Sequence, residues 1–275
     1  MKTIRALQST ALYLILSVVL LVLAIPFLWM VSASFKEQFE IFRSPPTILP
    51  PKPILTNYTT LFGEYNFIRH FLNSVQIAVI TTVSQLFLCS LAGYAFAKYE
   101  FRLKNVLFLV MLGSMMIPGY TYFVPLFQLV INLGLVDTRI GIVLPHLVGA
   151  FGIFFMRQHM ESVPDELLDA GRIDGTSEFA AFWKIALPLV RPGLTVLALL
   201  AFLGSWNDYV WPLIIIRTRE MQTLPVMLAG MVGIYRIEYG ALMAGAFLSA
   251  LPVLLLFGSM QRYFVAGIME GALRG

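Results

Sequence analysis

Six long runs of apolar residues divide the chain, and each is long enough to cross a membrane as a helix. A helix needs about 20 predominantly apolar residues to span the hydrocarbon core of a bilayer, and polar side chains are sparse within these runs. The pattern predicts six transmembrane helices, at residues 10–33, 71–97, 105–131, 140–156, 193–216 and 240–263. The expected fold class is all-α: a polytopic membrane protein with one transmembrane domain over residues 1–275 in the lipid bilayer.

Composition supports this interpretation and excludes other classes. Hydrophobic residues make up 59% of the chain and charged residues 12%, half of the roughly 25% that is usual in a soluble domain. Disorder is excluded because a disordered chain combines few apolar residues with much charge. The net charge of +4 comes without a basic, aromatic-rich patch, so we expect no nucleic-acid partner. The single cysteine and three scattered histidines predict no metal site.

The loop between the second and third runs sets the expected orientation. It is short and carries Lys98, Arg102 and Lys104, and short loops weigh most in the positive-inside rule. This places both termini in the cytoplasm. The first apolar run exceeds the 7–15 residues of a signal-peptide core, so we expect it to be retained as a span.

Polar side chains within the runs mark a possible translocation path: Gln128, Asn207 and Asp208. Asp208 is the one carboxylate deep in an apolar run, and an ionisable group within a membrane helix is a functional candidate. It lies about 15 residues into its run, roughly 22 Å at 1.5 Å per residue, so simple hydration near the outer end is an equal alternative. Prolines lie in or near five of the runs. Either proline is simply commoner in membrane helices, or these helices are bent around a cavity, and the second interpretation is slightly favoured.

The connection between the fourth and fifth runs, residues 157–192, differs from the other loops. It is the longest predicted internal connection and holds six of the fifteen acidic residues. Ser162 is expected to cap a helix that has an early proline and then Asp165, and Asp165 and Glu166 complement the positive helix N-terminus. Gly175 is expected to end this helix, because glycine adopts the left-handed conformation without strain.

A second helix is predicted to follow at once. Thr176 or Ser177 can cap it, Glu178 lies in its first turn, and Pro188 is expected to end it. Its apolar side chains form one stripe at i, i+3, i+4 and i+7: Phe179, Phe182, Trp183 and Ala186. One side of the first helix carries a mixed set: Leu167, Ala170, Gly171 and Asp174.

Three arrangements of this helix pair are open at this point. It can pack on the protein's own spans, lie in the lipid interface, or dock into a groove of a partner. The small side chains of Ala170 and Gly171 would let the partner's surface approach the helix closely. The pattern alone favours packing on the protein's own spans. Lipid docking is disfavoured because the acidic loop would be repelled by anionic headgroups.

The loop and the fifth run together resemble the ABC importer permeases. Glu166–Gly175, followed by Phe182–Pro192, resembles the Glu-Ala-Ala loop of that family, and Trp206–Leu213 resembles a motif of its fifth span. More narrowly, the chain is similar to the carbohydrate-uptake branch, which includes the smaller permease subunit of maltose importers and the glycerol-phosphate permeases. The chain departs from the family pattern at Asp169-Ala170-Gly171, where Glu-Ala-Ala is usual, and at Thr176, where alanine is usual.

This resemblance implies a type I ABC importer permease in the cytoplasmic membrane of a bacterium or archaeon. Such a chain is not an enzyme and pairs with a second homologous permease, two ATP-binding cassette subunits and an extracytoplasmic solute-binding protein. No phosphate-binding loop motif is present in the sequence, so ATP and Mg are expected in the partner subunits and no cofactor in this chain. The expected substrate is a sugar or oligosaccharide; glycerol phosphate or another polar solute is the alternative, and an ion-coupled secondary carrier, which would explain Asp208, is the less favoured one.

The resemblance also assigns the ATPase-coupling residues. We expect the helix Leu167–Asp174 to insert into a cleft of an ATPase subunit, with Asp169 facing a basic group there. The full set of expected coupling residues is Glu166, Leu167, Asp169, Ala170, Gly171, Arg172, Asp174, Gly175, Phe179 and Trp183.

Overall fold

The structure is a computed structural model that describes residues 2–233 and 237–273; residues 1, 234–236 and 274–275 of the expected domain lie outside the described residues. Within that part of the chain every regular element is helical, apart from one isolated bridge between Val232 and Ile237. The all-α prediction is therefore confirmed. The chain divides into two compact units, Met1–Ile68 with Met227–Pro252 and Arg69–Val226 with Val253–Gly275.

The first unit is organised around the end of the first span. Its elements are α1 (Lys2–Ser34), α2 (Gln38–Ile41), α3 (Thr56–Gly63), most of α14 (Leu224–Gly230) and the first part of α15 (Tyr239–Leu273). The side-chain amide of Asn57 donates hydrogen bonds to the carbonyls of Ser34, at 2.9 Å, and Lys36, at 2.8 Å. Lys36 is fully buried, donates to the Thr47 carbonyl, and holds its ammonium 4.3 Å from the centre of the Trp29 ring. These contacts satisfy a buried charge that would otherwise be costly.

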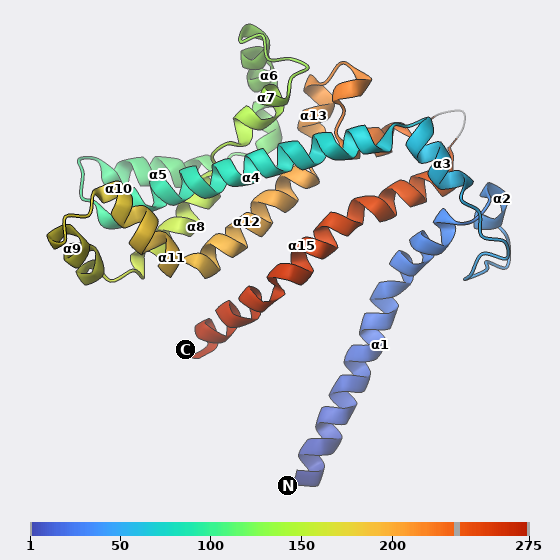
Figure 1. The fold of residues 1–275 in the computed structure, drawn as a ribbon, viewed down its shortest axis with the longest axis horizontal. Helices are drawn as coiled ribbons and strands as arrows, with labels where there is room; N and C mark the ends of the chain where they lie inside the picture. Colours follow the sequence, from blue (N-terminus) through green and yellow to red (C-terminus); the bar gives the residue numbers. More distant parts are fainter. Residues whose placement is uncertain (1, 234–236, 274–275) are drawn as a thin grey trace. The chain divides into compact units, whose positions relative to one another are not determined.

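The second unit holds the elements that build both candidate sites (Figure 1). In chain order these are α4 (Phe67–Lys98), α5 (Lys104–Ser114), η1 (Gly119–Tyr122), α6 (Phe123–Asn132), α7 (Arg139–Val143), η2 (Leu144–His146), α8 (Ala150–Glu161), α9 (Asp165–Ile173), α10 (Glu178–Ala181), the π-helix η3 (Phe182–Ala186), α11 (Leu187–Leu189), α12 (Arg191–Trp206), α13 (Val210–Ile215) and η4 (Arg219–Met221).

Four helical stretches among the described residues are long and apolar enough to cross a membrane: Thr10–Ser34, Phe67–Lys98, Arg191–Ile215 and Tyr239–Gln261. The expected spans 105–131 and 140–156 are present as bent pairs, α5 with Gly119–Asn132 at 95° and Arg139–His146 with α8 at 47°. The first bend falls at Pro118, which lacks a backbone donor and disfavours helix in the residue before it. The second falls at Gly149, whose backbone is extended. The number of crossings is therefore four, or up to six if each bent pair is one span.

Close packing between α4 and α8 fixes the end of α4 that carries the loop. Gly93 on α4 lies directly against α8, since a Cβ added there would lie 2.8 Å from the backbone nitrogen of Arg157. Small residues let membrane helices approach closely in this way. Met156, Met160 and Phe182 fill the adjoining core and are fully buried. The second loop helix is thus joined to the same core as the spans.

Candidate functional site

The connection 157–192 forms two helical segments at the end of α4 that leads to α5 (Figure 1). The positions of Gly175 and Ser177 are as the sequence predicts. Gly175 has a φ of +81°, and the Ser177 hydroxyl accepts a hydrogen bond from the Ala180 amide at 3.3 Å. The prediction that Ser162 caps the first helix is wrong. Its hydroxyl donates to the His159 carbonyl at 2.7 Å, so it lies at the end of α8, and Pro164 precedes α9.

The second segment continues past Pro188, which corrects the expected end of this helix. After α10 the backbone widens into the π-helix Phe182–Ala186 and then returns to α-helix in Leu187–Leu189. Proline lacks the amide that an α-helix would use, and a π-turn changes which carbonyls need a donor. The widened turn therefore lets Pro188 lie within the segment instead of ending it.

Paired charges hold the first loop helix in place. The Lys98 ammonium lies 2.7 Å from the Asp165 carboxylate and donates to the Val163 carbonyl at 2.5 Å. Arg172 lies 2.7 Å from Asp169 and 2.8 Å from Glu178, and the Tyr99 hydroxyl also donates to Glu178.

These partners keep the carboxylates of Asp165 and Glu178 ionised. The hydrogen bond and charge of Lys98 lower the pKa of Asp165 below its usual range. The hydrogen bonds from Arg172, and then from Tyr99, lower the pKa of Glu178 in the same way. Both carboxylates are charged at neutral pH, so the network is complete under physiological conditions.

The two faces of α9 differ from the expected arrangement. Leu168 and Gly171 are buried, and a Cβ added at Gly171 would lie 2.7 Å from Ile185 Cδ1 of the second segment. Gly171 therefore serves the approach of the loop's own two helices, not that of an outside surface. The exposed side carries Glu166, Leu167, Asp169, Ala170 and Ile173. Ile173 was not among the expected coupling residues, although its spacing from Leu167 and Ala170 would have indicated it, and its side chain is 86% exposed.

The remaining expected coupling residues lie at the surface of the loop. Asp174 is exposed at the end of α9. The predicted apolar stripe of the second segment is divided, because Phe182 and Ala186 are fully buried whereas Phe179 and Trp183 are exposed. The rings of Phe179 and Trp183 stack on each other with their centres 6.5 Å apart. Half of the stripe thus packs on the protein's own core, and half presents an aromatic surface.

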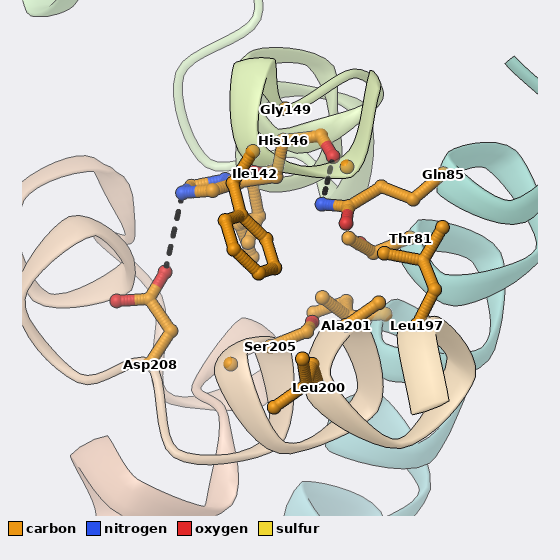
Figure 2. A pocket seen from close by; sticks show the side chains of 14 residues that line it. Thr81, Gln85, Ile142, His146, Gly149, Leu197, Leu200, Ala201, Ser205 and Asp208 are labelled. Carbon is orange, nitrogen blue, oxygen red and sulfur yellow. Dashed lines mark hydrogen bonds and ion pairs between the residues drawn. The ribbon is translucent and has the colours of Figure 1, made fainter. Parts of the chain in front are cut away.

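A cavity of about 240 Å³ in the second unit forms the other candidate site (Figure 2). Its walls come from α4, α7, η2, α8, α12 and the residues next to them, and its polar lining is Thr81, Gln85, His146, Ser205 and Asp208. Figure 2 shows Thr81 and Gln85 on one side and Asp208 on the other, with His146 between them. The Gln85 amide donates to the His146 carbonyl at 2.7 Å.

His146 links two walls of this cavity. Its Nδ1 donates to the Ile142 carbonyl at 3.1 Å, so the opposite nitrogen, Nε2, faces Asp208 at 3.9 Å from Oδ2. Of the three expected path residues, the structure brings only Asp208 to the cavity. Asn207 is exposed at the end of α12, and Gln128 on α6 donates to Asn132 at 3.0 Å. Across the described part of the chain, no group of three His, Cys, Asp or Glu side chains is placed to hold a metal ion.

Comparison with known proteins identifies the family. Residues 85–270 match the model of the binding-protein-dependent transport system inner membrane component. The chain is 40% identical to the arabinooligosaccharides transport system permease protein AraQ of Halalkalibacterium halodurans, covering 91% of each chain. It is 34% identical to the lactose transport system permease protein LacG of Rhizobium radiobacter, covering 96% of each. A crystal structure of a bacterial ABC transporter involved in the import of the acidic polysaccharide alginate superimposes with a TM-score of 0.84 at 23% identity, over 94% of this chain and 97% of that one.

The chain belongs to the family of binding-protein-dependent transport system inner membrane components. It is an integral inner-membrane protein with the fold of an ABC importer permease. Membership of this family implies partnership with ATPase and binding-protein subunits. The resemblance noted in the sequence is thereby confirmed.

Proposed function

We propose that this chain is one of two homologous permease subunits that together import a neutral oligosaccharide. The relatives named for arabinooligosaccharides and lactose support this substrate class. The cavity also supports a neutral substrate. None of the described residues that line the cavity is lysine or arginine, and one of them is Asp208. Phosphate recognition relies on arginine and lysine, so a glycerol-phosphate substrate is disfavoured.

The coupling role of α9 rests on one observation, the exposed apolar face of a helix in which Asp165, Asp169 and Arg172 are already paired within the chain. Leu167, Ala170 and Ile173 are exposed on this face, while Leu168 and Gly171 hold its opposite side. A helix that lays apolar side chains at such spacing into a groove is a common mode of partner recognition. We infer that the groove belongs to an ATPase subunit, which binds ATP and Mg, and that α9 transmits ATP-driven closure to the spans as a rigid element.

The substrate is tested by uptake into vesicles that contain the complete importer. We expect ATP-dependent accumulation of radiolabelled arabinotriose or lactose, and none of glycerol 3-phosphate. A collapse of uptake when the proton gradient is dissipated at constant ATP would instead support an ion-coupled carrier. Purification in mild detergent from the native host, with mass spectrometry, should recover a second permease, two ATPase subunits and the solute-binding protein.

The coupling role is tested by Ile173→Asp with Ile48→Asp as its control. Ile48 is 77% exposed in the loop between α1 and α4, which the proposed orientation, with both termini in the cytoplasm, puts outside. We expect Ile173→Asp to weaken ATPase association on the order of tenfold or more and to stop uptake, with normal membrane insertion. Ile48→Asp should leave association unchanged, and equal association in both variants would contradict the proposal.

A further inference from the structure

Arg139 lies at the end of a bent membrane crossing, and the described part of the chain does not neutralise its charge. It is the first residue of the helix pair Arg139–His146 with Ala150–Glu161, so it lies where that crossing meets the lipid headgroups. Its Nη2 donates to the side-chain oxygen of Asn73 at 3.1 Å, and no carboxylate of the described residues forms an ion pair with it. A guanidinium has five N–H donors, so most of those of Arg139 remain available to an anion.

The contact with Asn73 holds the guanidinium in a fixed position. Asn73 on α4 is 2% exposed, and its amide nitrogen donates to the carbonyls of Glu220, at 2.8 Å, and Gln222, at 3.1 Å. These two bonds fix the orientation of the amide, which turns its oxygen to Arg139. The arginine is therefore positioned before any ligand binds, and this reduces the entropy that binding would cost.

An apolar groove of about 220 Å³ lies beside Arg139, between α4 and the segment of α7 and η2. Apart from Arg139, its described lining is entirely aliphatic: Ile80, Ile140, Val143, Leu144 and Leu147. Residues 139–147 extend over about 12 Å at 1.5 Å per residue, from the end of the crossing towards the middle of the bilayer. The groove is too small to admit a helix, which is about 10 Å across, but it suits a stretch of one hydrocarbon chain.

A phospholipid combines the two chemical groups that this arrangement fits. Its phosphate accepts charge-assisted hydrogen bonds from arginine, often two at once, and its acyl chain matches the aliphatic lining. An anionic lipid fits better than a zwitterionic one, because its headgroup has no cation that would repel the guanidinium. A protein partner fits less well, since protein interfaces are enriched in aromatic side chains and hydrogen bonds, and the aliphatic lining offers neither.

We propose that Arg139 and this groove bind one anionic phospholipid. The phosphate lies on the Arg139 guanidinium, and one acyl chain lies along Ile80, Ile140 and Leu144. The groove shares no lining residue with the cavity that contains Asp208. The lipid site is thus an addition to the proposed transport function and does not depend on it.

The first test uses phosphatidylglycerol with a photoreactive group in one acyl chain, in vesicles that contain the complete importer. Mass spectrometry should find the label within residues 139–147. Arg139→Gln removes the charge, whereas Asn73 keeps its two bonds to backbone carbonyls, so we expect labelling to fall about three- to tenfold with the fold intact. Arg219→Gln is the matched control. Arg219 is also exposed and has no ion pair among the described residues, but it does not line the groove, so labelling should equal that of the parent protein.

A second pair of variants tests the apolar part of the site. In Leu144→Trp the indole ring should fill the groove and leave Arg139 in place, so labelling should fall several-fold. Leu129→Trp should not change it, because Leu129 on α6 is 52% exposed and lies outside the groove. Phosphatidylcholine with the same photoreactive group should label the parent protein several-fold less than phosphatidylglycerol does. Free inorganic phosphate, which has no acyl chain, should not compete.

Three results would overturn the lipid site. Equal labelling by the two lipids, or labelling that Arg139→Gln leaves unchanged, would mean that the groove contacts only bulk lipid. Competition by inorganic phosphate would mean that Arg139 binds a free anion. A crosslink from Leu144→Cys to the second permease, without lipid labelling, would mean that protein covers the groove.

Discussion

The loop and the cavity satisfy their polar groups in opposite ways. Around α9 several charged side chains find partners within the chain, in three ion pairs: Lys98 with Asp165, Arg172 with Asp169, and Arg172 with Glu178. In the cavity, Thr81 has no described partner. A surface on which most charges are paired recognises a partner chiefly by shape and apolar contact, whereas a cavity lined by Gln85, Ser205 and Asp208 favours a polar occupant. The two sites therefore suit a protein partner and a hydroxyl-rich solute, respectively.

Of the substitutions that test this comparison, Gly175→Val is expected to have the largest effect on uptake and ATPase association. The φ of +81° is unfavourable for any residue with a Cβ and most of all for a β-branched one. The turn between α9 and the second segment should be lost, which would abolish uptake and ATPase association while leaving the membrane spans and the cavity intact. Co-purification of the ATPase and an uptake assay measure this.

Gly175→Asn is the matched control, because asparagine tolerates the left-handed conformation far better than valine does. It should retain most of the uptake. An equal loss of uptake in the two variants would mean that any side chain at this position disrupts the turn, whatever backbone conformation the residue prefers.

The next largest effect separates the two faces of α9. Ala170→Trp adds a large ring to the exposed face and should block ATPase docking without changing the loop itself. Gly171→Trp should also stop docking, but for a different reason, since its ring would displace Ile185 and detach α9 from the second segment. Hydrogen exchange of α9 in the complex-free subunit should rise for Gly171→Trp and stay unchanged for Ala170→Trp. Normal docking of Ala170→Trp would show that this face is not the interface.

The loop indicates what the sequence can and cannot predict. Gly175 and Ser177 were predicted correctly because backbone conformation and capping depend on local chemistry. The assignments of Ser162 and Pro188 were wrong, because a longer α8 and a π-helix depend on the packing of Met160 and Phe182 in the core. The orientation of Gly171 could not be predicted either, since a helix with small residues on one side gives no sign of which neighbour approaches.

The cavity was less predictable than the loop. Asp208 was singled out because a carboxylate in an apolar run is conspicuous. Gln85 and His146 have the same kind of signal, polar residues within apolar runs, but their convergence depends on the bend between η2 and α8. Thr81 gives no signal in the sequence, because a helical threonine usually bonds to its own backbone.

A smaller effect is expected from Asp208→Asn. The amide keeps the shape of the carboxylate and can still bond to a sugar hydroxyl, so the variant loses the charge that lies 3.9 Å from His146 Nε2 and little else. We expect uptake to fall about threefold, the loss of one modest hydrogen-bond contribution, with unchanged dependence on ATP. Dissipating the proton gradient at constant ATP should affect neither the variant nor the parent protein. If uptake by the parent protein depends on the proton gradient and uptake by Asp208→Asn does not, Asp208 is a proton-coupling group.

The smallest effect is expected from Asp169→Ala. This carboxylate is 63% exposed and already paired with Arg172, and exposed ion pairs contribute little because water and salt screen them. Arg172 keeps Glu178 as its second partner, so α9 should stay in place. We expect ATPase association to weaken about twofold at low salt, and the difference from the parent protein to vanish at high salt, when association is titrated at both ionic strengths. A loss that persists at high salt would mean that Asp169 makes a buried contact with the ATPase, and the apolar face of α9 would then share recognition with a charged group.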